Sequence, residues 1–154
     1  MVLIRLRSWA AALVVAASAA PGAAQITTGL SIWDGVFTVE QARRGQTAYT
    51  GPCDRCHGYK LDGASDDPDM LPTPPAGGPK FLRNWEGRSL AALFEYTQRT
   101  MPANNPGFLT MRELVDVIAY MLLVSGVPAG DTELGVEPRD LAQIVIESRR
   151  NDDS

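Results

Sequence analysis

Residues 53–57 read Cys53-Asp54-Arg55-Cys56-His57, and this pentapeptide holds both cysteines and the only histidine of the 154-residue chain. The two cysteines are three positions apart, and the histidine follows the second one directly. One short turn therefore presents two thiols and an imidazole together. A chain of this length is long enough for one domain, so we expect a single core.

This spacing is the C-x-x-C-H signature of covalent haem attachment. Cys53 and Cys56 can each bond one vinyl-derived arm of the porphyrin. The imidazole of His57 then projects over the same haem face, where a ring nitrogen can bind the iron. The sequence therefore predicts one covalently attached haem c, with Cys53, Cys56 and His57 in contact with it.

Zinc binding, thiol redox chemistry and a plain disulfide each fit these residues less completely. A zinc site needs about four ligands, and the chain has no further cysteine or histidine to complete one. A thioredoxin-like redox pair belongs beside a βαβ pattern, which the sequence does not show. A plain disulfide is possible outside the cytosol, but it assigns no role to the adjacent histidine.

The second axial position of the iron is expected to be filled by Met101. The chain has no second histidine, and methionine is the other common ligand opposite a histidine. Met101 precedes Pro102, and a residue before proline is restricted to extended conformations, so Met101 should lie on a loop. Met70 is only thirteen positions beyond His57, and Met121 belongs to the apolar face of a predicted helix. The alternative is that Met101 only packs on the porphyrin edge.

Residues 1–24 read as a signal peptide that is removed after export. Arg5 and Arg7 form a positive start, an apolar run follows from Trp9 to Ala19, and small residues precede Gln25. Haem is attached to such motifs outside the cytoplasm, so we expect a periplasmic protein that begins at Gln25. The alternative is an uncleaved anchor, but a spanning helix needs roughly 20 apolar residues and this run is too short. No membrane span is expected in the mature chain.

The charge of the mature chain argues against nucleic-acid binding. Removal of residues 1–24 leaves 12 basic and 18 acidic residues, a formal charge of −6. Only Lys60 and Lys80 are lysines, and no basic run could follow a phosphate backbone. Acidic residues gather at positions 62–69 and in the C-terminal tail, where a solvated surface is a simpler role than a docking patch.

Three helices are predicted from capping residues and helix breakers. The first follows the capping-box arrangement Thr38-Val39-Glu40-Gln41 and ends before Gly51. The second begins near Ser89 and ends at Met101-Pro102. The third follows another capping box, Thr110-Met111-Arg112-Glu113, and stops near Gly126.

Residues at helical spacing give each of these helices one face to bury. These residues are Val39, Ala42, Gly45 and Tyr49; Leu90, Leu93, Phe94 and Thr97; and Leu114, Val117, Ile118, Met121 and Leu122. Because Gly45 has no side chain, we expect the first and third helices to cross there, with Tyr49 near Ile118 and Tyr120. The alternative is that Gly45 merely weakens its own helix by about 1 kcal/mol.

The stretch between His57 and Trp85 is rich in glycine and proline, which predicts a loop with little regular structure. The carbonyl of Pro74 or Pro75 should accept the second ring N–H of His57 and fix its orientation. Trp85 is a candidate to line the pocket and to donate its indole N–H to a haem propionate. A simple core tryptophan fits the sequence equally well.

With these features placed, the chain resembles the class I c-type cytochromes over about residues 36–124. The C-x-x-C-H motif, Met101-Pro102 and the flanking helices carry the resemblance. The stretches Phe81–Trp85 and Thr100–Gly107 look closest to small cytochromes and cytochrome domains that accompany bacterial quinoprotein alcohol or sugar dehydrogenases. The resemblance implies an all-α fold, with three main helices and long irregular loops around the haem, and a periplasmic location. A longer Asp/Pro-rich insertion, residues 65–75, departs from the usual pattern.

The expected organisation is a signal peptide (1–24), an N-terminal arm (25–35), a cytochrome c domain (36–126) and a C-terminal tail (127–154). The tail contains a short apolar run, Leu141 to Ile146, and is expected to lie across the surface of the domain.

Two filled axial positions leave no place for a substrate on the iron, so an electron carrier is expected and an enzyme is not. The carrier would pass single electrons from a periplasmic dehydrogenase to a terminal oxidase or another cytochrome. One alternative is a permanently bound cytochrome subunit of a quinoprotein or flavoprotein dehydrogenase. The other is a peroxidase-like or gas-binding haem protein in which Met101 is displaced.

Overall fold

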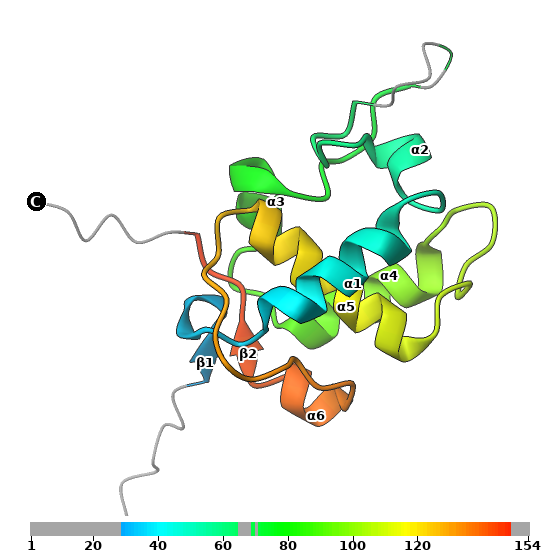
Figure 1. The fold of residues 1–154 in the computed structure, drawn as a ribbon. Coiled ribbons are helices and arrows are strands. Elements are labelled where there is room, and N and C mark those ends of the chain that lie inside the picture. Colours follow the sequence, from blue (N-terminus) through cyan, green and yellow to red (C-terminus); the bar gives the residue numbers. More distant parts are fainter. Residues whose placement is uncertain (1–28, 65–68, 70, 149–154) are drawn as a thin grey trace, which may run out of the picture.

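The computed structural model describes residues 29–64, 69 and 71–148, so the expected signal peptide and residues 65–68 and 70 of the expected insertion 65–75 lie outside the described residues. Within the described ranges the chain is mostly helical, as predicted, and no helix there is long and apolar enough to cross a membrane (Figure 1). The elements in chain order are β1 (Leu30–Ser31), the 3-10 helix η1 (Ile32–Asp34), α1 (Val39–Tyr49), α2 (Asp54–His57), α3 (Gly78–Trp85), α4 (Leu90–Thr100), α5 (Met111–Val124), α6 (Pro138–Leu141) and β2 (Ile144–Val145).

The three predicted helices are confirmed as α1, α4 and α5, and capping residues explain where they begin. Thr110 and Glu113 form a complete capping box at α5: the Thr110 N–H donates to Glu113 Oε2 at 2.9 Å, and the Glu113 N–H donates to Thr110 Oγ1 at 3.3 Å. At α1 only half of the predicted box exists. Thr38 Oγ1 accepts from the Gln41 N–H at 3.1 Å, but the Gln41 side chain binds elsewhere in the core.

The predicted buried faces are confirmed except at the start of α1 and at Thr97 of α4, which is only partly buried. The five apolar residues predicted for α5 are all buried, and so are Ala42, Gly45 and Tyr49 of α1. Val39 is 37% exposed, contrary to the prediction. Phe37, just before the capping residue, is fully buried and supplies the apolar contact at this end of the helix.

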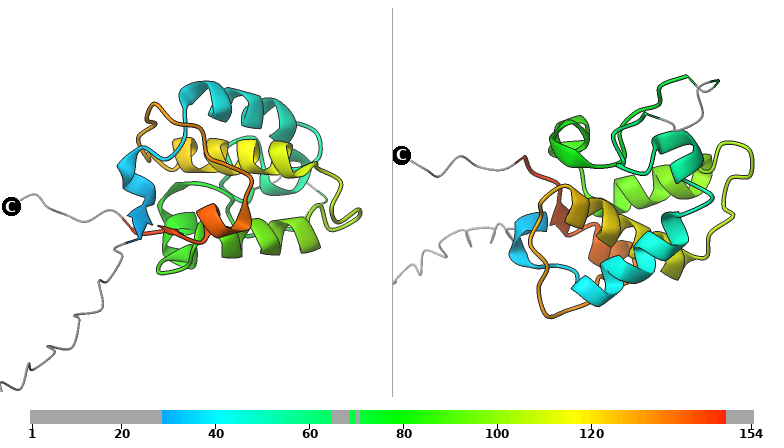
Figure 2. Two further views of the ribbon diagram at one scale, coloured as in Figure 1. Left: turned by 90° about the horizontal axis from the view of Figure 1, so that it is seen from below. Right: turned by 45° about the horizontal axis from the view of Figure 1, so that its top comes forward.

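Helices α1 and α5 cross at Gly45, as the sequence predicts. A β-carbon at Gly45 would lie 1.8 Å from the carbonyl oxygen of Asp116 and 2.9 Å from the backbone nitrogen of Val117. One turn further along, the rings of Tyr49 and Tyr120 meet edge to face, with centroids 5.6 Å apart. Helix α5 lies between α1 and α4 (Figure 2, left), so it forms the centre of the helical layer.

The expectation of an irregular loop from His57 to Trp85 is wrong for its last part. Gly78–Trp85 forms helix α3, with Pro79 in its first turn, where proline's missing N–H is not needed. Phe81 and Leu82 of this helix are buried in the core. The Gly-Gly-Pro sequence that suggested a loop is therefore the start of a helix.

The chain after Gly126 contributes more to the core than its sequence suggested. Buried apolar residues continue through this segment: Val127, Leu134, Leu141, Ile144 and Ile146. Its strand β2 pairs in parallel with β1, with Leu30 opposite Ile144. The Gln41 side chain donates to the Leu134 carbonyl at 2.9 Å and accepts from its N–H at 2.8 Å, which fastens the segment to α1.

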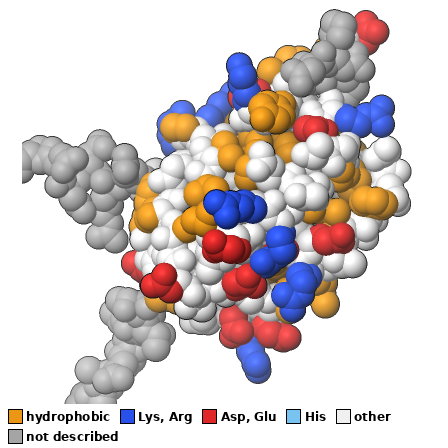
Figure 3. All heavy atoms as spheres, in the orientation of Figure 1, with side chains coloured by type: hydrophobic (Ala, Val, Ile, Leu, Met, Phe, Trp, Pro, Cys, Tyr) orange, Lys and Arg blue, Asp and Glu red, His pale blue; other side chains and the backbone are white. Residues whose placement is uncertain are grey.

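A network around Arg44 joins α1, α5 and this C-terminal segment. Arg44 donates to both carboxylate oxygens of the buried Asp116, at 2.9 and 3.1 Å, and pairs with Glu133 at 2.9 Å. Hydrogen bonding to these two carboxylates raises the pKa of Arg44 further, and the same contact lowers the pKa of Glu133. Basic and acidic side chains lie beside one another over the face shown in Figure 3.

Candidate cofactor site

The two cysteines and the histidine lie on one tight turn directly after α1. The Cys53 N–H continues the helix by donating to the Tyr49 carbonyl at 3.0 Å, and Asp54 Oδ1 accepts from the Gly51 N–H at 2.9 Å. The His57 N–H then donates to the Cys53 carbonyl at 2.9 Å, which closes the single turn of α2. The end of α1 thus fixes the direction of the whole pentapeptide.

The ring of His57 is oriented by the loop that follows it. Its Nδ1 lies 2.8 Å from the carbonyl oxygen of Pro74, which decides between the two prolines left open by the sequence. A carbonyl only accepts, so Nδ1 carries the proton and Nε2 is left with a free lone pair. This arrangement is the one that metal-binding histidines adopt in proteins.

Backbone hydrogen bonds hold the loop between His57 and α3 in place. The Gly63 N–H donates to the His57 carbonyl at 3.0 Å, and the N–H groups of Ala76 and Gly77 both donate to the Leu61 carbonyl, at 2.9 and 3.0 Å. Leu61 itself is fully buried. Gly63 has a φ of +84°, and a β-carbon there would lie 2.0 Å from the Thr73 carbonyl oxygen. Glycine is therefore required at position 63 for the backbone there to pack against the backbone of Thr73.

Tyr49 ties this loop back to α1. Its hydroxyl donates to the Gly58 carbonyl at 3.0 Å, and the residue is 3% exposed. Burial raises the pKa of the phenol, so the hydroxyl stays protonated and able to donate at neutral pH. Tyr49 thus fixes the backbone directly after His57, and the Pro74 carbonyl fixes its ring.

Met101 lies where the sequence placed it, on the loop after α4. Its backbone is extended, with φ −123° and ψ 147°, and its N–H closes the helix by donating to the Thr97 carbonyl at 2.8 Å. The Gly107 N–H donates to the Met101 carbonyl at 3.2 Å, so the loop returns onto itself. The thioether is therefore presented by a constrained loop.

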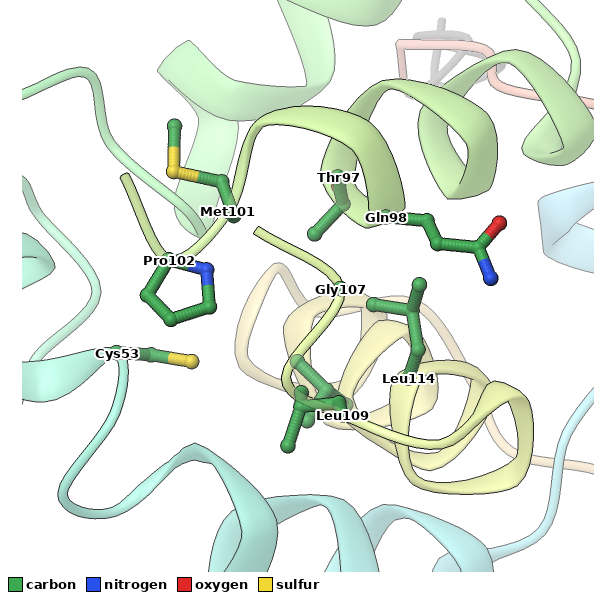
Figure 4. A pocket seen from close by; sticks show the side chains of 9 residues that line it. Cys53, Thr97, Gln98, Met101, Pro102, Gly107, Leu109 and Leu114 are labelled. Carbon is green, nitrogen blue, oxygen red and sulfur yellow. The ribbon is translucent and has the colours of Figure 1, made fainter. Parts of the chain in front are cut away.

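Cys53 and Met101 border the same hollow, which is almost wholly apolar and encloses about 310 Å³ of space, part of it open to solvent. Figure 4 shows the Cys53 sulfur directed toward this hollow, with Pro102 and Met101 beside it. The residues that line it are Cys53, Thr97, Gln98, Met101, Pro102, Gly107, Leu109, Leu114 and Val117. Of the predicted site residues, Cys56, His57 and Trp85 are not among these.

The thiol of Cys53 is not tuned for thiol–disulfide chemistry. Burial, with smaller contributions from Asp54 and Cys56, raises its pKa to about 11. Reactive cysteines have lowered pKa values, because the thiolate is the nucleophile. Both cysteines are free, and a protonated thiol beside an apolar hollow suits a covalent attachment point better than a redox pair.

Trp85 lies at the end of α3, apart from the residues that line the hollow. Its ring meets that of Tyr96 edge to face, with centroids 5.5 Å apart, and the Arg88 guanidinium lies 4.2 Å from its ring centroid. These contacts join α3 to α4. The predicted contact of Trp85 with a haem propionate stays a prediction.

Sequence reasoning missed Thr73 and Leu109. Thr73 Oγ1 lies 3.2 Å from His57 Nδ1. The two residues are sixteen positions apart, so no local sequence pattern predicts this contact. Leu109 and Leu114 line the hollow beside the start of α5, and only Leu114 was part of the predicted apolar stripe. The signal for Leu109 was its place on the same constrained loop as Met101.

The residues present fit a covalently attached haem. Two free thiols stand on one turn with an imidazole whose Nδ1 is already engaged, and a thioether borders the adjoining apolar hollow. These are the groups that attach and ligate a haem of the c type.

Comparison with known proteins gives one family and one solved structure. The model of the family described as cytochrome c oxidase, cbb3-type, subunit III matches residues 40–121, just over half of the chain. Curated protein sequences give no match. The crystal structure of the sulfane dehydrogenase SoxCD from Paracoccus pantotrophus is similar at 18% identity and a TM-score of 0.43, over 74% of this chain and 61% of that chain.

Proposed function

The chain belongs to the family of cytochrome c domains described as cytochrome c oxidase, cbb3-type, subunit III, and on this premise we propose that it is a periplasmic one-electron carrier. It is a class I c-type cytochrome that binds haem c covalently. The haem supplies the redox chemistry, because its iron gains and loses a single electron. The carrier passes electrons from a dehydrogenase to a terminal acceptor such as an oxidase or another cytochrome.

Four residues carry the proposed site. Cys53 and Cys56 would form the thioether bonds to the haem, and His57 Nε2 and the Met101 sulfur would hold its iron. The observation that carries the proposal is the 2.8 Å contact between His57 Nδ1 and the Pro74 carbonyl, because it leaves Nε2 as the metal-binding nitrogen. The position of Met101 beside the same hollow as Cys53 supports its role.

Electron transfer follows from a filled coordination sphere. If the His57 imidazole and the Met101 thioether both held the iron, no position would be open for a substrate, and little rearrangement would accompany the change of charge. Methionine opposite histidine also raises the reduction potential, which suits an electron acceptor from a dehydrogenase. The almost wholly apolar lining of the hollow suits a porphyrin face better than water.

The axial assignment is tested by substituting Met101 in the haem-loaded protein. The oxidised wild type should show the weak absorption band of iron–methionine bonding at the red end of the visible spectrum, and the reduced wild type should bind carbon monoxide slowly. Met101→Ala should lose the band and bind carbon monoxide rapidly. The matched control is Met111→Ala, since Met111 is 52% exposed at the start of α5. A band that persists in Met101→Ala would assign the ligand to another residue.

Attachment and location are tested separately. The haem of the secreted wild type should resist extraction into acidified organic solvent, and substitution of both Cys53 and Cys56 by alanine should abolish this resistance. Mass spectrometry of the periplasmic fraction should give a chain that begins at Gln25. A colourless mature protein would overturn the proposed function, and an intact Met1 would overturn the proposed processing.

The second candidate is a permanently bound cytochrome subunit of a quinoprotein or flavoprotein dehydrogenase. The observation that favours a bound subunit over a free carrier is that the matching family is itself described as a subunit, there of a cytochrome c oxidase. Size-exclusion chromatography of the native periplasmic extract, followed at a haem absorption band, distinguishes the two. A free carrier elutes at the mass of one chain, and a subunit elutes with a larger flavin- or quinone-containing protein.

A further inference from the structure

The hydroxyl of Thr73 lies between the backbone carbonyl of Cys56 and the ring of His57. Its Oγ1 is 2.8 Å from the Cys56 carbonyl oxygen and 3.2 Å from His57 Nδ1. The carbonyl can only accept, so the hydroxyl proton is donated to Cys56. A lone pair of Oγ1 is then available to the Nδ1–H of His57, which is shared with the Pro74 carbonyl at 2.8 Å.

The backbone holds this hydroxyl in position. The Thr73 N–H donates to the Gly63 carbonyl at 2.9 Å, and Gly63 in turn donates to the His57 carbonyl at 3.0 Å. Thr73 is partly buried, whereas its neighbours Leu71, Pro72 and Pro74 are exposed. Among residues 71–74, Thr73 is therefore the one that turns inward, and its side chain points at the imidazole.

We propose that Thr73 is a positioning residue of the redox site: its hydroxyl, together with the Pro74 carbonyl, fixes the ring plane of His57 and strengthens the imidazole as a ligand. The inference rests on the proposed function, because it takes His57 to bind the iron. Acceptors at Nδ1–H raise the basicity of a metal-bound imidazole. A stronger donor stabilises the oxidised iron, so Thr73 lowers the reduction potential.

Four variants test this role in the haem-loaded protein, with Thr73→Ala as a second variant that lacks the hydroxyl. Thr73→Val removes the hydroxyl and keeps the shape of the side chain, and Thr73→Ser keeps the hydroxyl. Thr47→Val is the matched control, because the Thr47 hydroxyl donates to the Arg43 carbonyl at 3.3 Å on the exposed side of α1. The measurements are the reduction potential, by redox titration, and the haem methyl shifts of the oxidised protein, which report the orientation of the axial ring.

Thr73→Val should have a higher reduction potential than the wild type. The ratio of reduced to oxidised protein at a fixed potential should rise about two- to tenfold, the range expected for the loss of one hydrogen bond. Its haem methyl shifts should also change. Thr73→Ser should restore both values, and Thr47→Val should leave both at the wild-type values.

Unchanged potential and methyl shifts in Thr73→Val would overturn the inference. So would the failure of both Thr73→Val and Thr73→Ala to mature while Thr73→Ser matures normally, because the role of Thr73 would then be structural alone. Failure of the proposed function is seen separately, in a wild type that carries no haem ligated by His57.

Discussion

Gly45 of α1 and Asp116 of α5 are in backbone contact: a β-carbon at Gly45 would lie 1.8 Å from the Asp116 carbonyl oxygen and 2.4 Å from its carbonyl carbon. Cβ atoms do not approach backbone atoms this closely, so any other residue forces the helices apart. The cysteine-bearing turn follows α1 directly, and α5 lines the hollow through Leu114 and Val117. The distance between these helices therefore determines the shape of the site.

Gly45→Ala should destabilise the haem-loaded protein. Alanine favours a helix over glycine by about 1 kcal/mol, but the clash with a rigid backbone should exceed this gain and lower the free energy of unfolding by about 1–3 kcal/mol. Urea unfolding followed by far-UV circular dichroism measures the difference. Thr47→Ala, on the exposed face of the same helix, should be neutral or stabilising. A Gly45→Ala variant as stable as the wild type would show that the helices can separate freely.

Gln41→Leu should lower the free energy of unfolding by about 2 kcal/mol or more, because leucine would leave the Leu134 N–H and carbonyl buried without partners, at about 1–3 kcal/mol for each. The Gln41 residue is 2% exposed and its amide pairs with both of these backbone groups. Thermal and urea unfolding measure the loss. Gln143→Leu, at an exposed position, is the control for added apolar surface. Equal midpoints in thermal unfolding would mean that water satisfies Leu134.

Leu141→Ala should cost about 2–5 kcal/mol, because Leu141 is fully buried and its loss leaves a cavity. Leu71→Ala removes the same atoms from a side chain that is 83% exposed, and it should change stability by less than about 0.5 kcal/mol. Because both variants remove the same atoms, the difference between their free energies of unfolding measures the effect of burial. Similar values for the two variants would show that the C-terminal segment does not belong to the cooperative core.

Glu133→Gln should destabilise the protein at neutral pH but not in acid. The hydrogen bond from Arg44 is the main cause of the lowered pKa of Glu133 in the folded state. The stabilisation is therefore complete above the ordinary pKa of glutamate and is lost as the pH falls through the lowered value. Thermal midpoints of wild type and variant should converge on acidification.

The size of this effect is small, because both side chains are about half exposed and the pair is screened by solvent. Asp131→Asn, an exposed change of equal charge nearby, is the control. A difference between Glu133→Gln and the wild type that stays constant with pH would contradict the pairing with Arg44.

Much of this fold could be predicted from local sequence signals. Thr38, Ser89 and Thr110 each accept a hydrogen bond from the first turn of the helix they precede, so the three main helices begin where capping rules place them. The period of the apolar residues then identified the buried face of α5. Met101 was placed on a loop by Pro102 alone, because the restriction before proline is local.

Apart from helix α3 and the exposed Val39, which are local errors, the errors concern contacts between distant segments. The short pairing of β1 and β2 leaves no recognisable period, and its Leu30 and Ile144 are brought together only by the fold. Gln41 was assigned to a capping box because the sequence cannot show that Leu134 competes for the same side chain. Thr73 was not predicted for the same reason, because its contact with His57 forms only when the loop folds back onto that residue.

The pairing of β1 with β2 places both ends of the described domain on the side of the molecule opposite the loop between α4 and α5, which carries Met101 (Figures 1 and 2). The Trp33 indole N–H donates to the Glu147 carbonyl at 3.0 Å and keeps these two ends together. A linker fused to either end, or a thiol introduced there to attach the protein to an electrode, would leave the opening beside Met101 facing outward. Immobilisation through the ends should therefore preserve access for a redox partner, whereas attachment at Phe108, an exposed residue of the loop between α4 and α5, should block it.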